Sequence, residues 1–197
     1  MERREALKKT VMAAGSAALA PTLLSLLKSC KGQPRLAWSP VFLSEPQAKF
    51  ISTFVDTLLP RTDTPGALDM KVDIFLDKVY ANLYTESAQA MVVSGIDEFN
   101  AICNEQFGED FADLNDHERA EILKQQERSS PKFNGRVWGT AVGHQQPVGF
   151  YRTLKSQALW AYFSSEEIGK NILSYDPVPG AYLGCIPLSD VGNTWSL

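Results

Sequence analysis

The fold of this chain follows from the stretch SEPQAKFISTFVDTLLP, residues 44–60. Ser44 is a favoured N-cap residue, and Pro60 ends a helix because proline has no backbone N–H to donate. Between them, apolar residues recur at helical spacing on one face: Phe50, Phe54, Val55, Leu58 and Leu59. The stretch therefore predicts an amphipathic helix whose apolar face belongs to a core.

Helical periodicity continues beyond the turn-rich loop at residues 61–66. We expect further helices over residues 72–83, 87–107, 115–128, 148–163 and 166–173. Gly108 ends the longest of them as a C′ residue, and Asn115 with Glu118 resembles a capping box for the next. In the helix over residues 72–83 the expected apolar stripe is Phe75, Leu76, Val79 and Leu83. The fold class is therefore all-α, a compact helical bundle-like domain of about five to six helices.

Two segments of the domain lack a helical period. Residues 129–147 read as a loop or a broken helix, and their Gly135, Gly139 and Gly143 do not have the spacing of a nucleotide-binding loop. Residues 174–197 are rich in Pro, Gly and aromatic side chains. We expect them to form an extended C-terminal tail laid over a surface.

The first thirty residues have the features of an export signal. Arg3 and Arg4 resemble a twin-arginine signal, and an apolar signal helix over residues 11–27 follows them. Leu27-Lys28-Ser29-Cys30 resembles a lipobox, and we therefore expect Cys30 to be lipidated. Lys28 is an unusual residue within such a motif. The chain then divides into a signal peptide (1–29), a tether (30–42) and a helical domain (43–197). We expect an exported protein on the periplasmic side, anchored to the membrane as a lipoprotein.

An alternative is that residues 11–27 remain attached as a transmembrane anchor, since about 17 residues is the lower limit for a span. Without the first 29 residues the chain carries 14 Lys and Arg against 21 Asp and Glu, a net charge near −7. The domain has no basic stripe, which disfavours nucleic acid as a partner.

Residues typical of catalysis or cofactor binding are scarce in the sequence. His117 and His144 have no metal-ligand partner at helical spacing, and no nucleophile motif or haem-attachment motif is present. We therefore expect no catalytic, cofactor-binding or metal-binding residue in this chain. Folded export then suggests a cofactor-containing partner that travels with it.

Six ordered blocks resemble the gluconate 2-dehydrogenase subunit 3 family. They are residues 43–45, 56–67, 162–166, 175–180, 184–188 and 192–196. The resemblance implies a non-catalytic small subunit of a membrane-bound periplasmic dehydrogenase that oxidises sugars, sugar acids or glycosides. Its implied partner is a glucose-methanol-choline-type flavoprotein that holds FAD, and a multihaem cytochrome c usually accepts the electrons. The implied role of the small subunit is to carry the export signal and stabilise the flavoprotein. Residues 134–146 look like an insertion relative to the family pattern.

The tail is the candidate partner interface, because its aromatic residues resemble binding hot spots and its prolines stiffen it. The candidate residues are Tyr175, Pro177, Pro179, Tyr182, Pro187 and Trp195. Alternatively, the same aromatics cap the core of the bundle. Cys103 and Cys185 could pair as a disulfide that ties the tail to the third helix, or Cys103 is simply buried. Two other functions remain open, a self-standing enzyme and a structural lipoprotein without a dehydrogenase partner.

Overall fold

The computed structural model describes residues 38–134, 136–137, 140–144, 146–178, 180 and 185–196. Residues from Trp38 onward form one compact unit. The expected export signal and its helix, with Arg3, Arg4 and Cys30, lie outside the described residues. Within the described part of the chain, no helix combines the length and the apolar character needed to cross a membrane.

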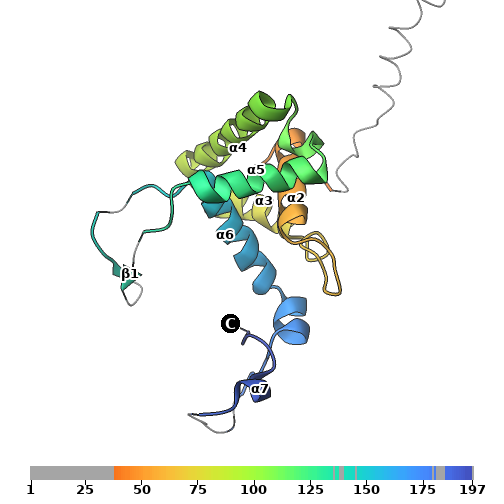
Figure 1. Cartoon of the computed structure of the whole chain (residues 1–197), viewed down its shortest axis with the longest axis vertical. Coiled ribbons are helices and arrows are strands. Elements are labelled where there is room, and N and C mark those ends of the chain that lie inside the picture. The colour runs from red at the N-terminus through yellow and green to blue at the C-terminus, as the bar shows by residue number, and fades with distance from the viewer. Residues whose placement is uncertain are drawn as a thin grey trace, which may run out of the picture. The chain divides into compact units, whose positions relative to one another are not determined.

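The described unit is helical, which confirms the expected all-α class (Figure 1). Its elements in chain order are α2 (Glu45–Leu58), α3 (Val72–Leu83), α4 (Glu86–Phe107), the 3₁₀ helix η1 (Phe111–Asp113), α5 (Asp116–Ser129), β1 (Arg136–Val137), β2 (Thr140–Ala141), α6 (Phe150–Phe163), the π-helix η2 (Ile168–Ile172) and α7 (Leu188–Val191). The two short strands pair with each other as an antiparallel hairpin in the loop between α5 and α6.

Helix α2 is the centre of the domain, and it contacts α3, η1, α4, α5 and α6. Phe50 and Phe54 on its buried face meet aromatic rings from three other elements. The ring centroid of Phe50 lies 5.4 Å from that of Phe99 in α4 and 5.4 Å from that of Phe111 in η1. Phe54 lies 6.1 Å from Tyr151 in α6. Edge-to-face and tilted pairs of this kind add to the stabilisation from burial, so this cluster is the core that the opening stretch predicts.

The expected helix boundaries hold where local capping determines them. The Asn115 side chain accepts hydrogen bonds from the backbone N–H groups of His117 and Glu118, and the Glu118 carboxylate accepts from the N–H of Asn115. Gly108 follows α4 with a φ of 79°, in the left-handed region that glycine adopts without strain. The capping box and the glycine stop are therefore confirmed.

The expected apolar stripe of α3 is wrong in part. Phe75 is 40% exposed and Leu83 is 76% exposed, whereas Leu76 is buried as expected. The buried face of α3 also includes the carboxylates of Asp73 and Asp77. Apolar spacing could not show this, because these carboxylates are buried only through contacts with residues distant in sequence.

Asp77 holds the segment that leads into α2. Its carboxylate accepts hydrogen bonds from the backbone N–H groups of Val41 (2.6 Å), Phe42 (3.1 Å) and Leu43 (2.9 Å). Asp73 accepts from the indole N–H of Trp38 at 3.1 Å. Both buried carboxylates are thus stabilised by N–H donors, which satisfies the requirement that a buried polar group keep its hydrogen bonds.

The expected insertion is closed at its base by its two end residues. The Asn134 amide donates to the carbonyl oxygen of Gln146 at 2.7 Å and accepts from the Gln146 N–H at 2.9 Å. The enclosed loop carries the β1–β2 hairpin and projects from the helices in Figure 1. Helix α6 begins at Phe150, two residues later than expected, and the segment after it is a π-helix rather than an α-helix.

Candidate partner-binding surface

The C-terminal tail is a closed loop whose two ends meet at Ser174. The Ser174 N–H donates to the carbonyl oxygen of Thr194 at 2.9 Å, and the Ser196 N–H donates to the Ser174 carbonyl oxygen at 2.8 Å. The Ser174 hydroxyl donates to the Val191 carbonyl oxygen at 2.6 Å. The Asn193 amide adds a bond to the Ile172 carbonyl oxygen of η2, at 2.9 Å. These bonds join the end of the tail to the end of η2.

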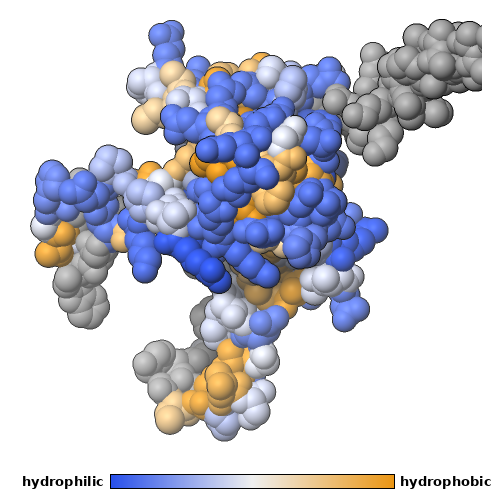
Figure 2. All heavy atoms as spheres, turned by 45° about the horizontal axis from the view of Figure 1, so that its top comes forward, coloured by the Kyte–Doolittle hydropathy of each residue, from blue (hydrophilic) through white to orange (hydrophobic). Residues whose placement is uncertain are grey.

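Large apolar side chains of the tail face solvent. Tyr175 is 47% exposed and Trp195 is 52% exposed. Further exposed apolar residues of the tail are Val178, Ile186 and Leu188. Figure 2 shows hydrophobic side chains gathered over the tail, at the bottom of the view. The described aromatics of the tail thus leave much of their surface accessible to a partner.

The other expected interface residues divide between exposed positions and positions that the structure leaves undescribed. Pro177 and Pro187 are exposed, whereas Pro179 and Tyr182 lie outside the described residues. Beyond Lys170 the sequence holds no Lys or Arg, and its acidic residues are Asp176 and Asp190. The surface of the tail is therefore apolar with a slight negative charge.

A second exposed aromatic pair lies on the helices and was missed in the sequence. Phe75 of α3 and Trp160 of α6 have ring centroids 5.7 Å apart, and Trp160 is 56% exposed. Phe163, one turn further along α6, is 42% exposed. The apolar spacing of α3 assigned Phe75 to the core, so no signal in the sequence distinguished it from a buried residue.

The loop at residues 60–69 shows why the family-like block at residues 56–67 contains a glycine, Gly66. A Cβ added at Gly66 would lie 2.7 Å from the backbone nitrogen of Arg61, so a larger residue would displace the backbone. The Gly66 N–H donates to the Asp69 carboxylate at 2.8 Å, and the same carboxylate oxygen pairs with Arg61 at 2.9 Å. The loop is thus a compact structural unit.

One cluster of charged side chains joins α5 to α6. The Glu127 carboxylate contacts Lys155 at 2.7 Å and Arg152 at 2.8 Å. These hydrogen bonds, with Lys155 first, lower the pKa of Glu127 to about 2. Arg152 also donates to the backbone carbonyl oxygens of Ser130 and Glu127. The cluster stabilises the junction of the two helices and has the character of a structural tie.

The two histidines were the remaining candidates for metal binding. His117 and His144 are exposed. Among the described residues, no group of three or more His, Cys, Asp or Glu side chains could hold a metal ion.

The two cysteines of the domain are free thiols in the structure. Cys103 is buried in α4, and Cys185 is exposed on the tail. Burial raises the pKa of the Cys103 thiol to about 12, which disfavours the reactive thiolate at neutral pH. The pairing of Cys103 with Cys185 as a disulfide stays a prediction. The alternative, that Cys103 is simply buried, agrees with the structure.

Comparisons with known proteins add one finding. A family model described as Gluconate 2-dehydrogenase subunit 3 matches residues 45–180. This range contains the blocks at residues 56–67, 162–166 and 175–180. It begins at the last residue of the block at 43–45 and ends before the blocks at 184–188 and 192–196. Searches of curated proteins and of solved structures found no match.

Proposed function

The chain belongs to the gluconate 2-dehydrogenase subunit 3 family, and from this premise we propose that it is the small accessory subunit of an exported, FAD-dependent dehydrogenase. The proposed partner is a large flavoprotein of the glucose-methanol-choline type, which holds FAD and performs the oxidation of a sugar, sugar acid or glycoside. The chain itself provides binding surface and the export signal. A cytochrome c subunit is a further proposed member of the complex.

The exposed apolar surface of the tail carries this proposal. Trp195 and Tyr175 together leave about half of their side-chain surface in water, although neither is needed to fill the aromatic core around Phe50. Exposed aromatic groups on a pre-organised loop are typical of binding surfaces, because little conformational entropy is lost when they become buried. The closed base at Ser174 supplies this pre-organisation.

The proposed benefit to the flavoprotein is stability. A subunit that binds only the folded flavoprotein stabilises it by mass action. The proposed lipid on Cys30 keeps the complex at the membrane, and Arg3 and Arg4 direct its export in the folded state. The FAD is thereby loaded before translocation.

Two surface variants test the tail interface. The double variant Tyr175→Ser/Trp195→Ser removes the exposed aromatics, and Phe133→Ser removes a similarly exposed aromatic from the loop between α5 and α6 as a control. Loss of a hot-spot aromatic costs about 2 kcal/mol, so we expect the tail variant to associate roughly thirtyfold more weakly with the flavoprotein. The control variant should associate as strongly as the wild-type protein. The measurement is the yield and FAD content of the flavoprotein that co-purifies from membranes, with circular dichroism to check folding.

The outcomes of this purification separate the alternatives. A flavoprotein that co-purifies in normal yield with the tail variant would contradict the tail interface. Purification of the wild-type protein with no flavin-containing chain would favour a structural lipoprotein. Dye reduction by the purified chain alone would favour a self-standing enzyme.

The anchor and the export route have tests of their own. Cys30→Ala should abolish labelling with a fatty-acid probe and leave the precursor uncleaved. Arg3→Lys/Arg4→Lys should retain both this chain and the flavoprotein in the cytoplasm. Normal export of the flavoprotein in the second variant would contradict the proposed co-transport.

A further inference from the structure

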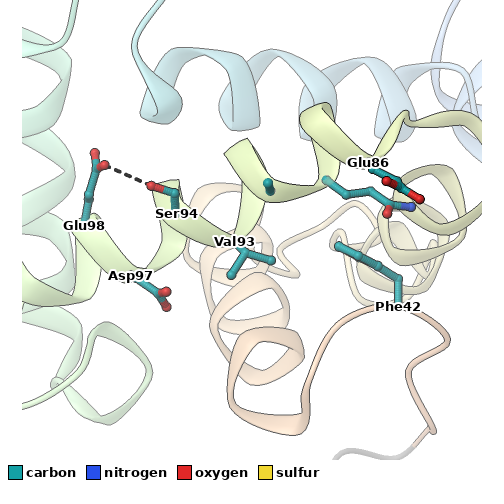
Figure 3. A pocket seen from close by; sticks show the side chains of 8 residues that line it. Phe42, Glu86, Val93, Ser94, Asp97 and Glu98 are labelled. Carbon is teal, nitrogen blue, oxygen red and sulfur yellow. Dashed lines mark hydrogen bonds between the residues drawn. The ribbon is translucent and has the colours of Figure 1, made fainter.

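A shallow groove lies along the first four turns of α4, beside Phe42 of the segment that leads into α2 (Figure 3). Its volume is about 530 Å³, and its apolar floor consists of Phe42, Ala90 and Val93. Glu86, Asp97 and Glu98 lie around this floor. In Figure 3, Val93 and Asp97 point to the same side of α4, and Phe42 lies beside Glu86.

The groove has fixed walls. The backbone N–H of Phe42 donates to the buried Asp77 carboxylate at 3.1 Å, so a side chain of α3 holds the backbone of this floor residue in place. The amide of Gln89 donates to the Tyr80 carbonyl oxygen at 2.8 Å, which ties the first turns of α4 to α3. A partner would therefore meet a groove that is already formed, and little ordering would be needed on binding.

The charge of the groove is unbalanced. Helix α4 carries four carboxylates and no Lys or Arg over its 22 residues. None of the three groove carboxylates forms an ion pair with a described residue, whereas Glu127 and Glu166 elsewhere each have a cationic partner. Glu98 accepts a hydrogen bond from the Ser94 hydroxyl at 3.1 Å. Glu86 at the start of the helix also complements the helix dipole, but that role does not involve Asp97 or Glu98.

We propose that this groove binds a cationic amphipathic helix of a partner protein. The distance along α4 from Glu86 to Glu98 is about 18 Å, which is the length of roughly 12 helical residues. Apolar side chains of such a helix would contact Phe42 and Val93, and flanking Lys or Arg side chains would pair with the three carboxylates. The proposal goes beyond the proposed function, because it does not require this partner to be the flavoprotein.

A synthetic peptide tests the groove directly. The probe is a fluorescent amphipathic helix of Leu and Lys, about 14 residues long, and its twin carries Glu in place of Lys. Binding to the full chain is followed by fluorescence anisotropy at about 50 mM salt, where surface charges are only partly screened. We expect the Leu/Lys peptide to bind and the Leu/Glu peptide not to bind.

Matched variants separate the groove from general attraction to an acidic protein. Asp97→Lys/Glu98→Lys should weaken binding of the Leu/Lys peptide about tenfold. Glu105→Lys/Glu109→Lys changes the net charge equally at exposed positions outside the groove, and we expect a loss of less than about threefold. Phe42→Ala should also weaken binding with all carboxylates intact.

Equal losses in the two charge-reversal variants, or no binding of the Leu/Lys peptide to the wild-type protein, would overturn the proposal. A failure of the flavoprotein to co-purify would leave it intact, since the peptide assay contains no dehydrogenase. Circular dichroism of each variant excludes unfolding as the cause of a loss.

Discussion

The phenol of Tyr162 donates a hydrogen bond to the carbonyl oxygen of Pro65 at 2.7 Å, across 97 residues of sequence. Pro65 lies in the loop after α2, and Tyr162 lies in the last turn of α6. The bond therefore joins an opening block of the family-like pattern to a closing block.

The first prediction concerns this bond. Tyr162→Phe keeps the buried ring but leaves the Pro65 carbonyl without its donor, so we expect a loss of about 1 kcal/mol in the free energy of unfolding. The measurement is urea unfolding followed by circular dichroism. Tyr175→Phe, which removes an exposed hydroxyl, is the control and should unfold like the wild-type protein. Equal midpoints for all three proteins would mean that the bond contributes nothing.

The second prediction concerns Asp77, which accepts three backbone N–H groups. Asp77→Asn places an amide N–H₂ where one carboxylate oxygen now accepts, so at least one buried N–H loses its partner. We expect a cost of roughly 2 kcal/mol in the free energy of unfolding, because hydrogen bonds to a charged group are among the stronger ones. Asp63→Asn in the exposed loop is the control. An Asp77 variant as stable as this control would contradict the role assigned to the carboxylate.

The third prediction concerns the contact between α4 and α6 at Gly95. A Cβ added there would lie 2.3 Å from the ring of Phe150, so Gly95→Ala must push the helices apart or displace the ring. We expect a loss of about 1 to 3 kcal/mol, although alanine in a helix is otherwise better than glycine by roughly 1 kcal/mol.

A double-mutant cycle identifies the clash as the cause. In Phe150→Ala the ring is absent, so adding Gly95→Ala to that variant should cost much less than it does in the wild-type protein. Gly180→Ala, where nothing lies within 4 Å of the added carbon, is the control. Additive losses in the cycle would rule out the clash.

The fourth prediction concerns the dependence of stability on pH. The pKa of Glu127 is lowered to about 2 by Lys155 and Arg152. Its contribution to stability is therefore complete above the ordinary pKa of glutamate and is lost as the pH falls toward about 2. Glu127→Gln should flatten the fall in melting temperature between about pH 4.5 and 2.

The control for this pH profile is Glu166→Gln. Glu166 pairs with Lys170 at 2.7 Å, but both side chains are largely exposed and water screens their attraction. We expect the profile of this variant to follow that of the wild-type protein. If the Glu127 variant also follows the wild-type profile, the tie between α5 and α6 has no role in acid stability.

The fifth prediction concerns the two thiols. As free groups, exposed Cys185 should react with a thiol reagent in the native protein, whereas Cys103 should react only after unfolding. Burial and the raised pKa of Cys103 both suppress the reactive thiolate. Counting labelled thiols by mass spectrometry measures both. Absence of labelling in the unfolded, unreduced protein would instead establish the Cys103–Cys185 disulfide.

The sequence by itself determined the helical class and most helix ends. Ser44, Pro60, Gly108 and Asn115 act through their own backbone and near neighbours, so their effects are local and readable from spacing. The Phe50 and Phe54 face could be assigned to the core for the same reason. The family-like blocks were also recognisable in the sequence, and the family match over residues 45–180 agrees with the blocks that lie inside that range.

The tertiary structure decided which polar residues are buried and which apolar residues are exposed. Asp77 is buried because the segment before α2 brings three N–H donors to its carboxylate. Phe75 is exposed because the face of α3 that packs against the core is the one that carries Asp73 and Asp77. The groove beside Phe42 has the same origin, since Asp77 holds that residue against α4. A helical period reports that a residue lies on a face, but the free energy of burying that face depends on hydrogen-bond partners that only long-range packing supplies.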